Sequence, residues 1–338
     1  MSQQWPGGLI RKTPPTPTGP YQDGTAPGVW TLDQMNYWLK QGLWPIAGNS
    51  QRGLFGGGNF VGGNTIQYIT ISSTGNATDF GDLLWQVADL GACSSSTRAL
   101  FLGRDKQIDY VTISTTGNSV YFGDGYALAS LNYRGIAGCS NATRGLWSGN
   151  MNYGGSASNN TVSYSTIATT GNGTYFGDLT QARMQVASCA SPTRGVTAGG
   201  YSTALASAVN VIDYATIATL GNYTYFGDLT ITMRNFAGCS SATRGLFGGG
   251  GALSNVINYI TIASAGYAID FGDLTTTNTE GIAACSSSTR GVFGGSYSPN
   301  SNVMSYVTIA TTGNATYFGD LLEAGGYRAG CSNVHGGL

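Results

Sequence analysis

The chain has 338 residues, a formal net charge of −1, and only 9% charged residues. Nucleic acids and anionic membranes bind clustered Lys and Arg, so this balance argues against either partner. No apolar run reaches the roughly 18 residues of a membrane span, and the N-terminus lacks the pattern of a signal peptide, so we expect neither segment.

The first 48 residues differ in composition from the rest, with four of the six Trp and seven of the nine Pro. Thr13–Pro20 is rich enough in proline to predict an extended, polyproline-like chain. Thr31-Leu32-Asp33-Gln34 fits a capping box, which predicts one short helix over about 31–41. Because so short a helix is not stable alone, it must pack on the rest of the chain or on another protein. We interpret residues 1–48 as a docking or oligomerisation arm with candidate contacts Trp5, Trp30, Tyr37, Trp38 and Trp44.

From residue 49 to residue 338 one module repeats six times. Phe-Gly-Asp, a cysteine, Tyr-x-Thr-Ile, and Arg-Gly or Arg-Ala each mark all six copies. The cysteines are separated by 46, 50, 50, 46 and 46 residues. Repeats of about 40 to 50 residues are typical of propellers, solenoids and arrays, so the repeat itself indicates the fold.

The fifth module shows how one copy is built. Its four predicted strands are Gly238–Ser241, Thr243–Phe247, Val256–Ala263 and Ala268–Leu274. A glycine-containing turn joins the last two, and no window shows the 3.6-residue apolar period of a helix. Four strands in about 48 residues predict a propeller blade, so residues 49–338 are predicted to form an all-β, six-bladed propeller. The first module lacks a first strand, which we expect the C-terminal strand to supply, closing the ring.

The order of features in a module resembles the kelch repeat. A di-glycine follows the second strand in four modules, a tyrosine marks the third strand, and an aromatic residue marks the fourth. The second module lacks the di-glycine, the third has an altered one, and Phe replaces the usual tryptophan at the blade end. The resemblance implies a kelch-like propeller with four-stranded blades, a fold that carries many different activities.

A second resemblance is to virion proteins of tailed bacteriophages. Pro27–Pro45 contains Pro-Gly-Val-Trp-Thr-Leu-Asp-Gln and then Gly-Leu-Trp-Pro, and the modules repeat Thr-Gly-Asn-x-Thr-x-Phe-Gly-Asp. Both are similar to segments of such proteins. The resemblance implies a virion component on the tail or capsid surface. In that setting, residues 1–48 would contact other virion proteins and the chain would form a homo-oligomer within the particle.

Two charged residues recur in every module, and we assign both to the fold because a binding site normally breaks the symmetry of a ring. We expect each Phe-Gly-Asp carboxylate to be buried and bonded to backbone amides or to a repeat arginine. The two rings are Asp82, Asp124, Asp178, Asp228, Asp273 and Asp320, and Arg52, Arg98, Arg144, Arg194, Arg244 and Arg290.

The six cysteines occupy one position on the innermost strand of each module. Neighbouring copies in a six-fold ring are expected about 8–12 Å apart, beyond the limit of about 7 Å between the Cα atoms of a disulfide. We therefore expect small buried residues packed between the blades, with neither disulfides nor a metal cluster.

The segments that differ most between modules follow the di-glycine or link one module to the next. In a propeller both kinds of segment leave the same face, and loops carry function while scaffolds repeat. Aromatic residues among Asn and Gly suit contacts with a sugar or a protein, although unconstrained drift would also explain the variation. The candidate contacts are Trp85, Tyr126, Tyr133, Met151, Tyr153, Tyr201 and Phe236.

The single histidine, His335, argues against enzymatic and metal chemistry. It removes histidine-rich metal sites and leaves one residue for any Ser-His-Asp triad. The scattered Asp and Glu residues leave a carboxylate pair for glycoside hydrolysis open. We expect a non-enzymatic virion protein without cofactors, most simply a tail or fibre adhesin for a host glycan or protein. The alternatives are a capsid decoration protein and a lectin-like or protein-binding propeller outside any virus.

Overall fold

The computed structural model describes residues 3–5, 8–10, 33, 51–59, 63–103, 106–126, 131–132, 135–152, 157–251, 254–277 and 279–338. The chain divides into two compact units, Met1–Ser50 and Gln51–Leu338. In the first unit β1 (Gln3–Trp5) pairs antiparallel with β2 (Gly8–Ile10). The predicted helix lies outside the described residues apart from Asp33, as do Thr13–Pro20 and the arm aromatics Trp30, Tyr37, Trp38 and Trp44.

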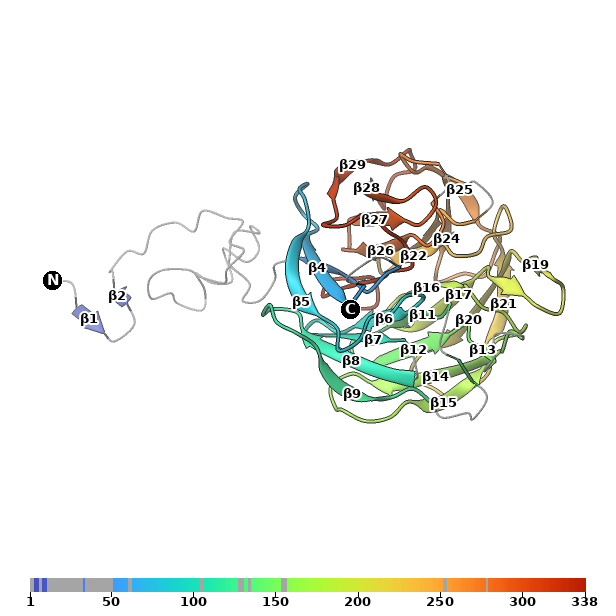
Figure 1. Ribbon diagram of the computed structural model, residues 1–338, viewed down its shortest axis with the longest axis horizontal. Coiled ribbons are helices and arrows are strands. Elements are labelled where there is room, and N and C mark those ends of the chain that lie inside the picture. Colours follow the sequence, from blue (N-terminus) through green and yellow to red (C-terminus); the bar gives the residue numbers. More distant parts are fainter. Residues whose placement is uncertain are drawn as a thin grey trace. The chain divides into compact units, whose positions relative to one another are not determined.

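The second unit is a six-bladed β-propeller in which every blade is a four-stranded antiparallel sheet (Figure 1), as the repeats predict. Blade 1 comprises β30 (Ala329–Ser332), β3 (Arg52–Gly56), β4 (Thr65–Thr70) and β5 (Thr78–Asp82). Blade 2 comprises β6 (Gly91–Ser94), β7 (Arg98–Leu102), β8 (Gln107–Thr112) and β9 (Val120–Asp124). Blade 3 comprises β11 (Ala137–Ser140), β12 (Arg144–Ser148), β14 (Thr161–Thr166) and β15 (Thr174–Asp178).

The remaining blades repeat this order, with the first-named strand of each at the axis (Figure 1). Blade 4 comprises β16 (Ala187–Ala190), β17 (Arg194–Ala198), β20 (Val211–Thr216) and β21 (Thr224–Asp228). Blade 5 comprises β22 (Ala237–Ser240), β23 (Arg244–Gly248), β24 (Val256–Thr261) and β25 (Ile269–Asp273). Blade 6 comprises β26 (Ala283–Ser286), β27 (Arg290–Ser296), β28 (Ser301–Thr308) and β29 (Thr316–Asp320). Two short two-stranded sheets are added, β10 (Leu131–Asn132) with β13 (Met151–Asn152) and β18 (Tyr201–Ser202) with β19 (Ser207–Ala208).

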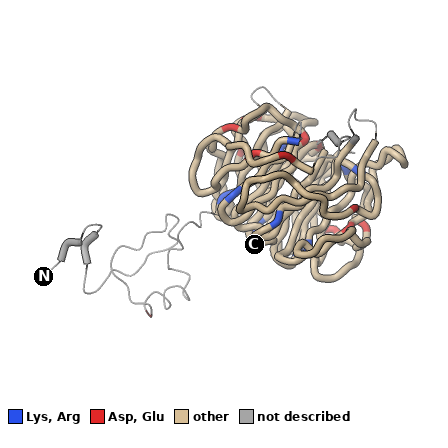
Figure 2. Tube along the Cα trace, turned by 90° about the horizontal axis from the view of Figure 1, so that it is seen from below, with Lys and Arg blue, Asp and Glu red and all other residues tan. Residues whose placement is uncertain are grey.

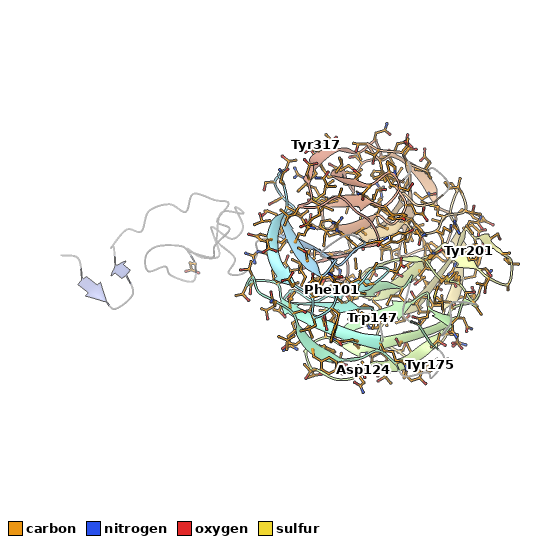
Figure 3. The ribbon with its side chains drawn as sticks, viewed as in Figure 1. Phe101, Asp124, Trp147, Tyr175, Tyr201 and Tyr317 are labelled. Atoms are coloured by element: carbon orange, nitrogen blue, oxygen red, sulfur yellow. The ribbon has the colours of Figure 1, made fainter. Side chains whose placement is uncertain are left out.

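The apolar core is divided into six clusters, each shared by two neighbouring blades. In one of them Leu54 and Ile66 of blade 1 pack with Phe101 and Val111 of blade 2. Phe101 and Trp147 lie inside the ring, whereas Tyr175 and Tyr317 lie at its outer edge (Figure 3). A blade therefore buries its faces only when both neighbours are present, which makes the closed ring the stable unit.

The C-terminal strand closes the ring as predicted. β30 pairs antiparallel with β3, placing Leu54 opposite Cys331 and Phe55 opposite Gly330. The first blade therefore contains strands from both ends of the propeller sequence. This pairing leaves no unpaired inner strand at the seam, where a free edge would invite association with another chain.

The repeat arginines join adjacent blades. Arg98 of blade 2 donates from Nη1 to Ala168 O of blade 3 at 2.7 Å, and its guanidinium lies 4.8 Å from the centre of the Tyr110 ring in its own blade. The same pair of contacts, to the next blade and to the blade's own tyrosine, recurs at Arg52, Arg144, Arg194, Arg244 and Arg290. Each arginine thus combines charge-assisted hydrogen bonds with a cation–π contact.

The Phe-Gly-Asp aspartates differ from the expectation of buried carboxylates. All six are partly exposed, and four accept a hydrogen bond from a tyrosine three residues earlier, as Asp178 does from Tyr175 at 3.0 Å. The cause is a β-bulge at the intervening phenylalanine: Tyr175 pairs with Ser163 and Gly177 with Val162, so Phe176 is the extra residue. The bulge turns the phenylalanine inward and leaves the tyrosine and the aspartate together on the outer surface.

The glycine of Phe-Gly-Asp is needed for contact with the next blade. A Cβ on Gly81 would collide with the carbonyl oxygen of Gly117 in the Thr-Gly-Asn turn of blade 2. That turn also hydrogen-bonds to the strand, since Asp82 N–H donates to Asn118 Oδ1 at 3.0 Å. The two most regular motifs of the sequence are therefore two sides of one junction between blades.

The six cysteines are free and buried, as predicted. Cys93 Sγ of blade 2 points at Gly145 of blade 3, where a side chain would collide with it. Burial raises the pKa of the Cys93 thiol well above its usual value, and the neighbouring Cys331 and Cys139 add to the shift. Thiols of this kind stay protonated and unreactive, which fits a packing role.

Candidate functional site

The two faces of the ring differ in how much their loops vary. Because every blade is an antiparallel meander, the loops between the second and third strands and the links between blades leave one face, which we call the variable face. The opposite, closed face carries the Ser-Ser-x-Thr-Arg and Thr-Gly-Asn turns. Within the described residues, no helix is long and apolar enough to span a membrane.

An axial channel, present as a series of cavities lined by the inner strands, runs between the two faces. At its closed-face end the lining is the Cys-Ser pair of each module, with Ala190 in place of serine in blade 4. The serine hydroxyls link the blades in sequence: Ser140 Oγ donates to Ser94 O at 2.7 Å, and Ser286 Oγ donates to Ser240 O at 2.9 Å. These bonds complete the hydrogen bonding of a buried strand end.

The C-terminal tail, residues 333–338, covers this end of the channel. His335 Nε2 lies 2.9 Å from Ser94 O of blade 2, and Gly336 N–H donates to Ser240 O of blade 5 at 2.9 Å. The chain terminus accordingly lies at the centre of the ring in Figure 1. The single histidine therefore holds the tail in place across the axis.

The other end of the channel opens on the variable face through a ring of six residues, one from each blade. All six have a positive φ, between 51° and 72°, a conformation that Gly, Asn and Asp adopt most readily. Each N–H donates to the carbonyl of the preceding blade's residue at 2.6–3.1 Å, and the ring closes from Asp89 N–H to Tyr327 O. We call this ring, with Glu280 and Tyr297 beside it, the axial mouth; its members are Asp89, Gly135, Gln185, Asn235, Gly281 and Tyr327.

The two glycines of the mouth make room for side chains of the following blades. A Cβ on Gly135 would lie 3.0 Å from Cγ of Gln185, and a Cβ on Gly281 would lie 3.0 Å from Cδ1 of Tyr327. Both side chains therefore lean over a glycine at the edge of the opening. The mouth lacks six-fold symmetry at these positions, unlike the Arg and Cys rings.

Polar and aromatic groups gather at one side of the mouth. Asn235 Nδ2 donates to Glu280 Oε1 at 2.9 Å, and the rings of Tyr297 and Tyr327 lie 5.2 Å apart. The pKa of Tyr327 is raised, first by burial and then by the carboxylates of Glu280 and Asp89. Both carboxylates are thus near one phenol, and the mouth is rich in hydrogen-bond acceptors.

Sequence reasoning missed the axial mouth, although a signal was present. Its residues stand four positions before each cysteine, and the set there is Asp, Gly, Gln, Asn, Gly and Tyr. Four of the six modules have Gly, Asn or Asp at this position, and that preference indicates a left-handed backbone. The surrounding residues are too variable for the pattern to stand out in a search for shared motifs.

The candidate contacts of the variable loops are placed differently from one another. Trp85 is 64% exposed, and its indole N–H donates to Gln107 at 2.9 Å. Tyr201 is half-buried, with the Arg234 guanidinium 5.3 Å from its ring centre, and Met151 is also half-buried. Tyr133 and Tyr153 lie outside the described residues.

Of two other candidates, one is buried and the other lies against a residue at the rim of the ring. Phe236 is only 5% exposed and packs against Phe247 in the core between blades 4 and 5, so its assignment as a contact residue was wrong. It follows the left-handed Asn235, which turns the chain inward. Tyr126 contacts Tyr175, which lies at the outer edge of the ring (Figure 3), with ring centres 5.8 Å apart.

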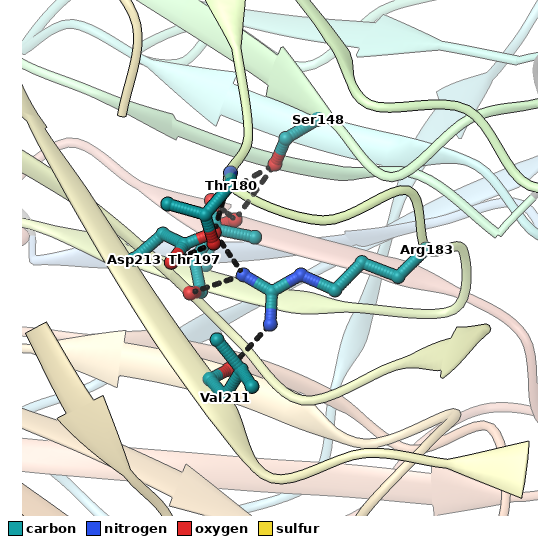
Figure 4. Close-up of polar contacts among 7 residues, drawn as sticks. Ser148, Thr180, Arg183, Thr197, Val211 and Asp213 are labelled. Carbon is teal, nitrogen blue, oxygen red and sulfur yellow. Dashed lines mark hydrogen bonds and ion pairs between the residues drawn. The ribbon is translucent and has the colours of Figure 1, made fainter. Parts of the chain in front are cut away.

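Within the described residues, the ion pair between Arg183 and Asp213 is fully buried. It stabilises the fold and is not part of the axial mouth. Arg183 Nη2 lies 2.8 Å from Asp213 Oδ2, and Thr180 donates to the same carboxylate through its hydroxyl and its backbone N–H (Figure 4). Burial lowers the pKa of Arg183, and Asp213 partly offsets this shift. In three other blades Gln67, Asp109 and Asn258 hold the equivalent link segments through backbone amides.

Charge is sparse over the rest of the propeller, as the colouring of Figure 2 shows. In the part of the chain that the structure describes, no group of three or more His, Cys, Asp and Glu could hold a metal ion. No protein-family model matches the chain, and no curated protein matches it. The site must therefore be interpreted from its own chemistry.

Proposed function

We propose that this protein is a non-enzymatic binding propeller that serves as a host-surface adhesin of a tailed bacteriophage. Its variable face, including the axial mouth, would bind the host surface, and residues 1–48 would attach it to other virion proteins. The virion setting rests on the resemblance of Pro27–Pro45 and of the kelch-like repeats to phage virion proteins. It also makes a homo-oligomeric arrangement in the particle the expected form.

One observation carries the binding role: the residues that hold the blades together repeat, whereas those around the axial mouth do not. Arginine, cysteine and Phe-Gly-Asp occur in every module. The six mouth positions instead carry five different residue types, and the exposed Trp85 occurs in one module alone. Selection for binding, rather than for folding, explains why symmetry is lost on the face that the tail leaves open.

We propose no catalytic role because of the chemical groups that the axial mouth carries. His335 belongs to the tail on the closed face, where it is partly buried, and both of its ring nitrogens are engaged with the backbone. The mouth is thus left to carboxylates, amides and phenols, which suit recognition. A lectin-like propeller outside any virus is the second candidate, since this acceptor-rich mouth would serve it equally well.

The test is a cryo-electron microscopy map of the native particle or assembly that contains this chain. The adhesin role predicts that residues 1–48 contact a neighbouring virion protein and that the variable face points away from the particle. A chain isolated as a free monomer, with no particle that contains it, would contradict the virion role. A propeller whose variable face packs against the capsid would favour a decoration protein.

A further inference from the structure

The outer edge of the propeller carries exposed tyrosines that do not follow the six-fold repeat. The residue before Phe-Gly-Asp is tyrosine in blades 2, 3, 4 and 6 and aspartate in blades 1 and 5. Blades 2–4 therefore present an uninterrupted run, whereas Tyr317 of blade 6 stands between two blades that lack the tyrosine. Tyr175 of the run and Tyr317 lie at opposite sides of the ring (Figure 3). We call Tyr121, Tyr175 and Tyr225, each with the aspartate three residues later, the tyrosine row.

Each tyrosine of the row is held by its aspartate, with its ring open to solvent. Tyr175 donates to Asp178 at 3.0 Å and is 39% exposed. Tyr121 and Tyr225 make the same bond at 2.9 Å, and each is 48% exposed. The bond to Asp228 raises the pKa of Tyr225 to about 12, so the phenol keeps its proton. A ring fixed in this way is a platform on which an apolar ligand face can pack with little further loss of side-chain entropy.

Polar groups of two neighbouring blades lie beside the rings. Asp178 is partly exposed, and a carboxylate that accepts one bond from Tyr175 can accept others. Its backbone N–H donates to Oδ1 of the exposed Asn222 in blade 4 at 3.0 Å, which leaves the amide N–H groups of Asn222 to donate to a ligand. Asn172 of blade 3 stands in the same relation to Asp124 of blade 2. One unit of the row thus offers an aromatic face, an acceptor and a donor.

Two further tyrosines enlarge the aromatic surface of the row. Five modules have an asparagine in the turn before the outer strand, and it accepts a bond from the preceding blade; blade 5 has Tyr267 instead. Tyr267 is 73% exposed and contributes to the raised pKa of Tyr225, which places the two phenols side by side. Tyr126 packs against Tyr175 with ring centres 5.8 Å apart. Folding does not explain Tyr267, because the exchange gives up a hydrogen bond and exposes an aromatic ring.

The arrangement of the row indicates the kind of ligand. Three similar units in consecutive blades can be used together only by an extended ligand, and a polymer of like units matches a row of like sites. A protein partner would gain nothing from the similarity of the units. The six outer strands, all within the described residues, contain aspartate but no Lys or Arg, so like charge disfavours an anionic polymer. Pyranose units have an apolar C–H face for the rings and an edge of hydroxyl groups for the polar side chains.

We propose that the tyrosine row binds a chain of a neutral polysaccharide, with a sugar unit packed on each of Tyr121, Tyr175 and Tyr225. Each unit binds weakly by itself, and the three act together because one polymer chain joins them. This inference goes beyond the proposed role of the variable face and does not depend on it.

The experiment is affinity electrophoresis of the full-length chain in gels that contain dextran, mannan, a neutral galactan or hyaluronan. Tyr175→Ala removes the middle ring of the row. Tyr317→Ala is the matched control outside the row, because it removes an equally placed ring and the same kind of bond, from Tyr317 to Asp320 at 2.8 Å. Thermal unfolding of both variants checks that each retains the folded ring.

We expect at least one neutral polysaccharide to retard the chain and hyaluronan to leave its mobility unchanged. Tyr175→Ala should weaken binding tenfold or more, because it interrupts the row, whereas Tyr317→Ala should bind as the native chain does. The proposal is overturned by any of three results: no retardation in a neutral gel, retardation by hyaluronan, or equal binding by the two variants.

The same experiment separates this inference from the proposed virion role. A chain that a neutral polysaccharide retards, but that belongs to no particle, would refute the virion role and leave the tyrosine row as a binding site. A chain found on a particle with its variable face outward, but retarded by no neutral polysaccharide, would refute the tyrosine row alone.

Discussion

At the scale of single residues, His335 shows how a position outside every repeat can hold the tail over one end of the axial channel. Ser94 O can only accept, so Nε2 must carry the proton, and Gly337 N–H then donates to Nδ1 at 3.1 Å. The neutral ring thus uses both nitrogens. Protonation would direct a second N–H at the Gly337 donor, which agrees with the lowered pKa that burial gives His335.

The stability of the propeller should therefore depend on pH through His335. Because its folded-state pKa is below the ordinary value of 6.5, the unfolded chain binds the proton more readily. The contribution is fully present above about pH 6.5 and is lost as the pH falls toward the folded-state value. Urea denaturation at about pH 7.5 and about pH 5.5 should show this loss in the native chain and a smaller one in His335→Gln. Equal losses in both proteins would assign the effect to other groups.

At the scale of strands and blades, much of the architecture could be predicted, because four strands per repeat leave few alternatives. The burial of some individual side chains could not be predicted. The bulge at Phe176 moves Asp178 outward. It cannot be predicted from the alternation of apolar and polar residues along a strand. The sequence predicts an exposed Phe236 because it does not reveal the left-handed turn at Asn235. That turn depends on a hydrogen bond to the neighbouring blade, which exists only in the folded ring. The axial mouth was missed for the same reason: it exists only when six blades close.

The repeat arginine and the repeat aspartate should differ in their effect on stability. Arg144 donates to Ile217 O and Ala218 O of the next blade at 3.0 and 2.8 Å and covers Tyr164, so Arg144→Ala should cost about 2 kcal/mol. Asp178 only accepts an exposed bond from Tyr175, so Asp178→Ala should cost about 0.5 kcal/mol. Chemical denaturation of the two variants measures both. An equal or larger loss for Asp178→Ala would restore the buried-carboxylate expectation.

At the scale of the whole molecule, the propeller is a repeat array with two unlike ends to its channel. The tail closes one end with residues that occur once, and the other end stays open through residues that differ from blade to blade. Folding demands that all six junctions between blades form, including the one between blades 6 and 1, where the ring closes. The proposed binding role requires that the residues around the mouth differ, and they meet both requirements because their hydrogen bonds to one another are made by the backbone.

The closing junction should be as sensitive as any other to a single methyl group. Gly319 of blade 6 has a φ of 156° and abuts the carbonyl of Gly75 in blade 1, so Gly319→Ala adds both strain and a collision. We expect a loss of about 2–4 kcal/mol. Gly75 on the other side of the junction is exposed with open space around its Cα, so Gly75→Ala should change stability by less than about 1 kcal/mol. Thermal unfolding of the two variants compares them directly. A Gly319→Ala protein as stable as Gly75→Ala would mean that blades 6 and 1 do not close as tightly as the other pairs.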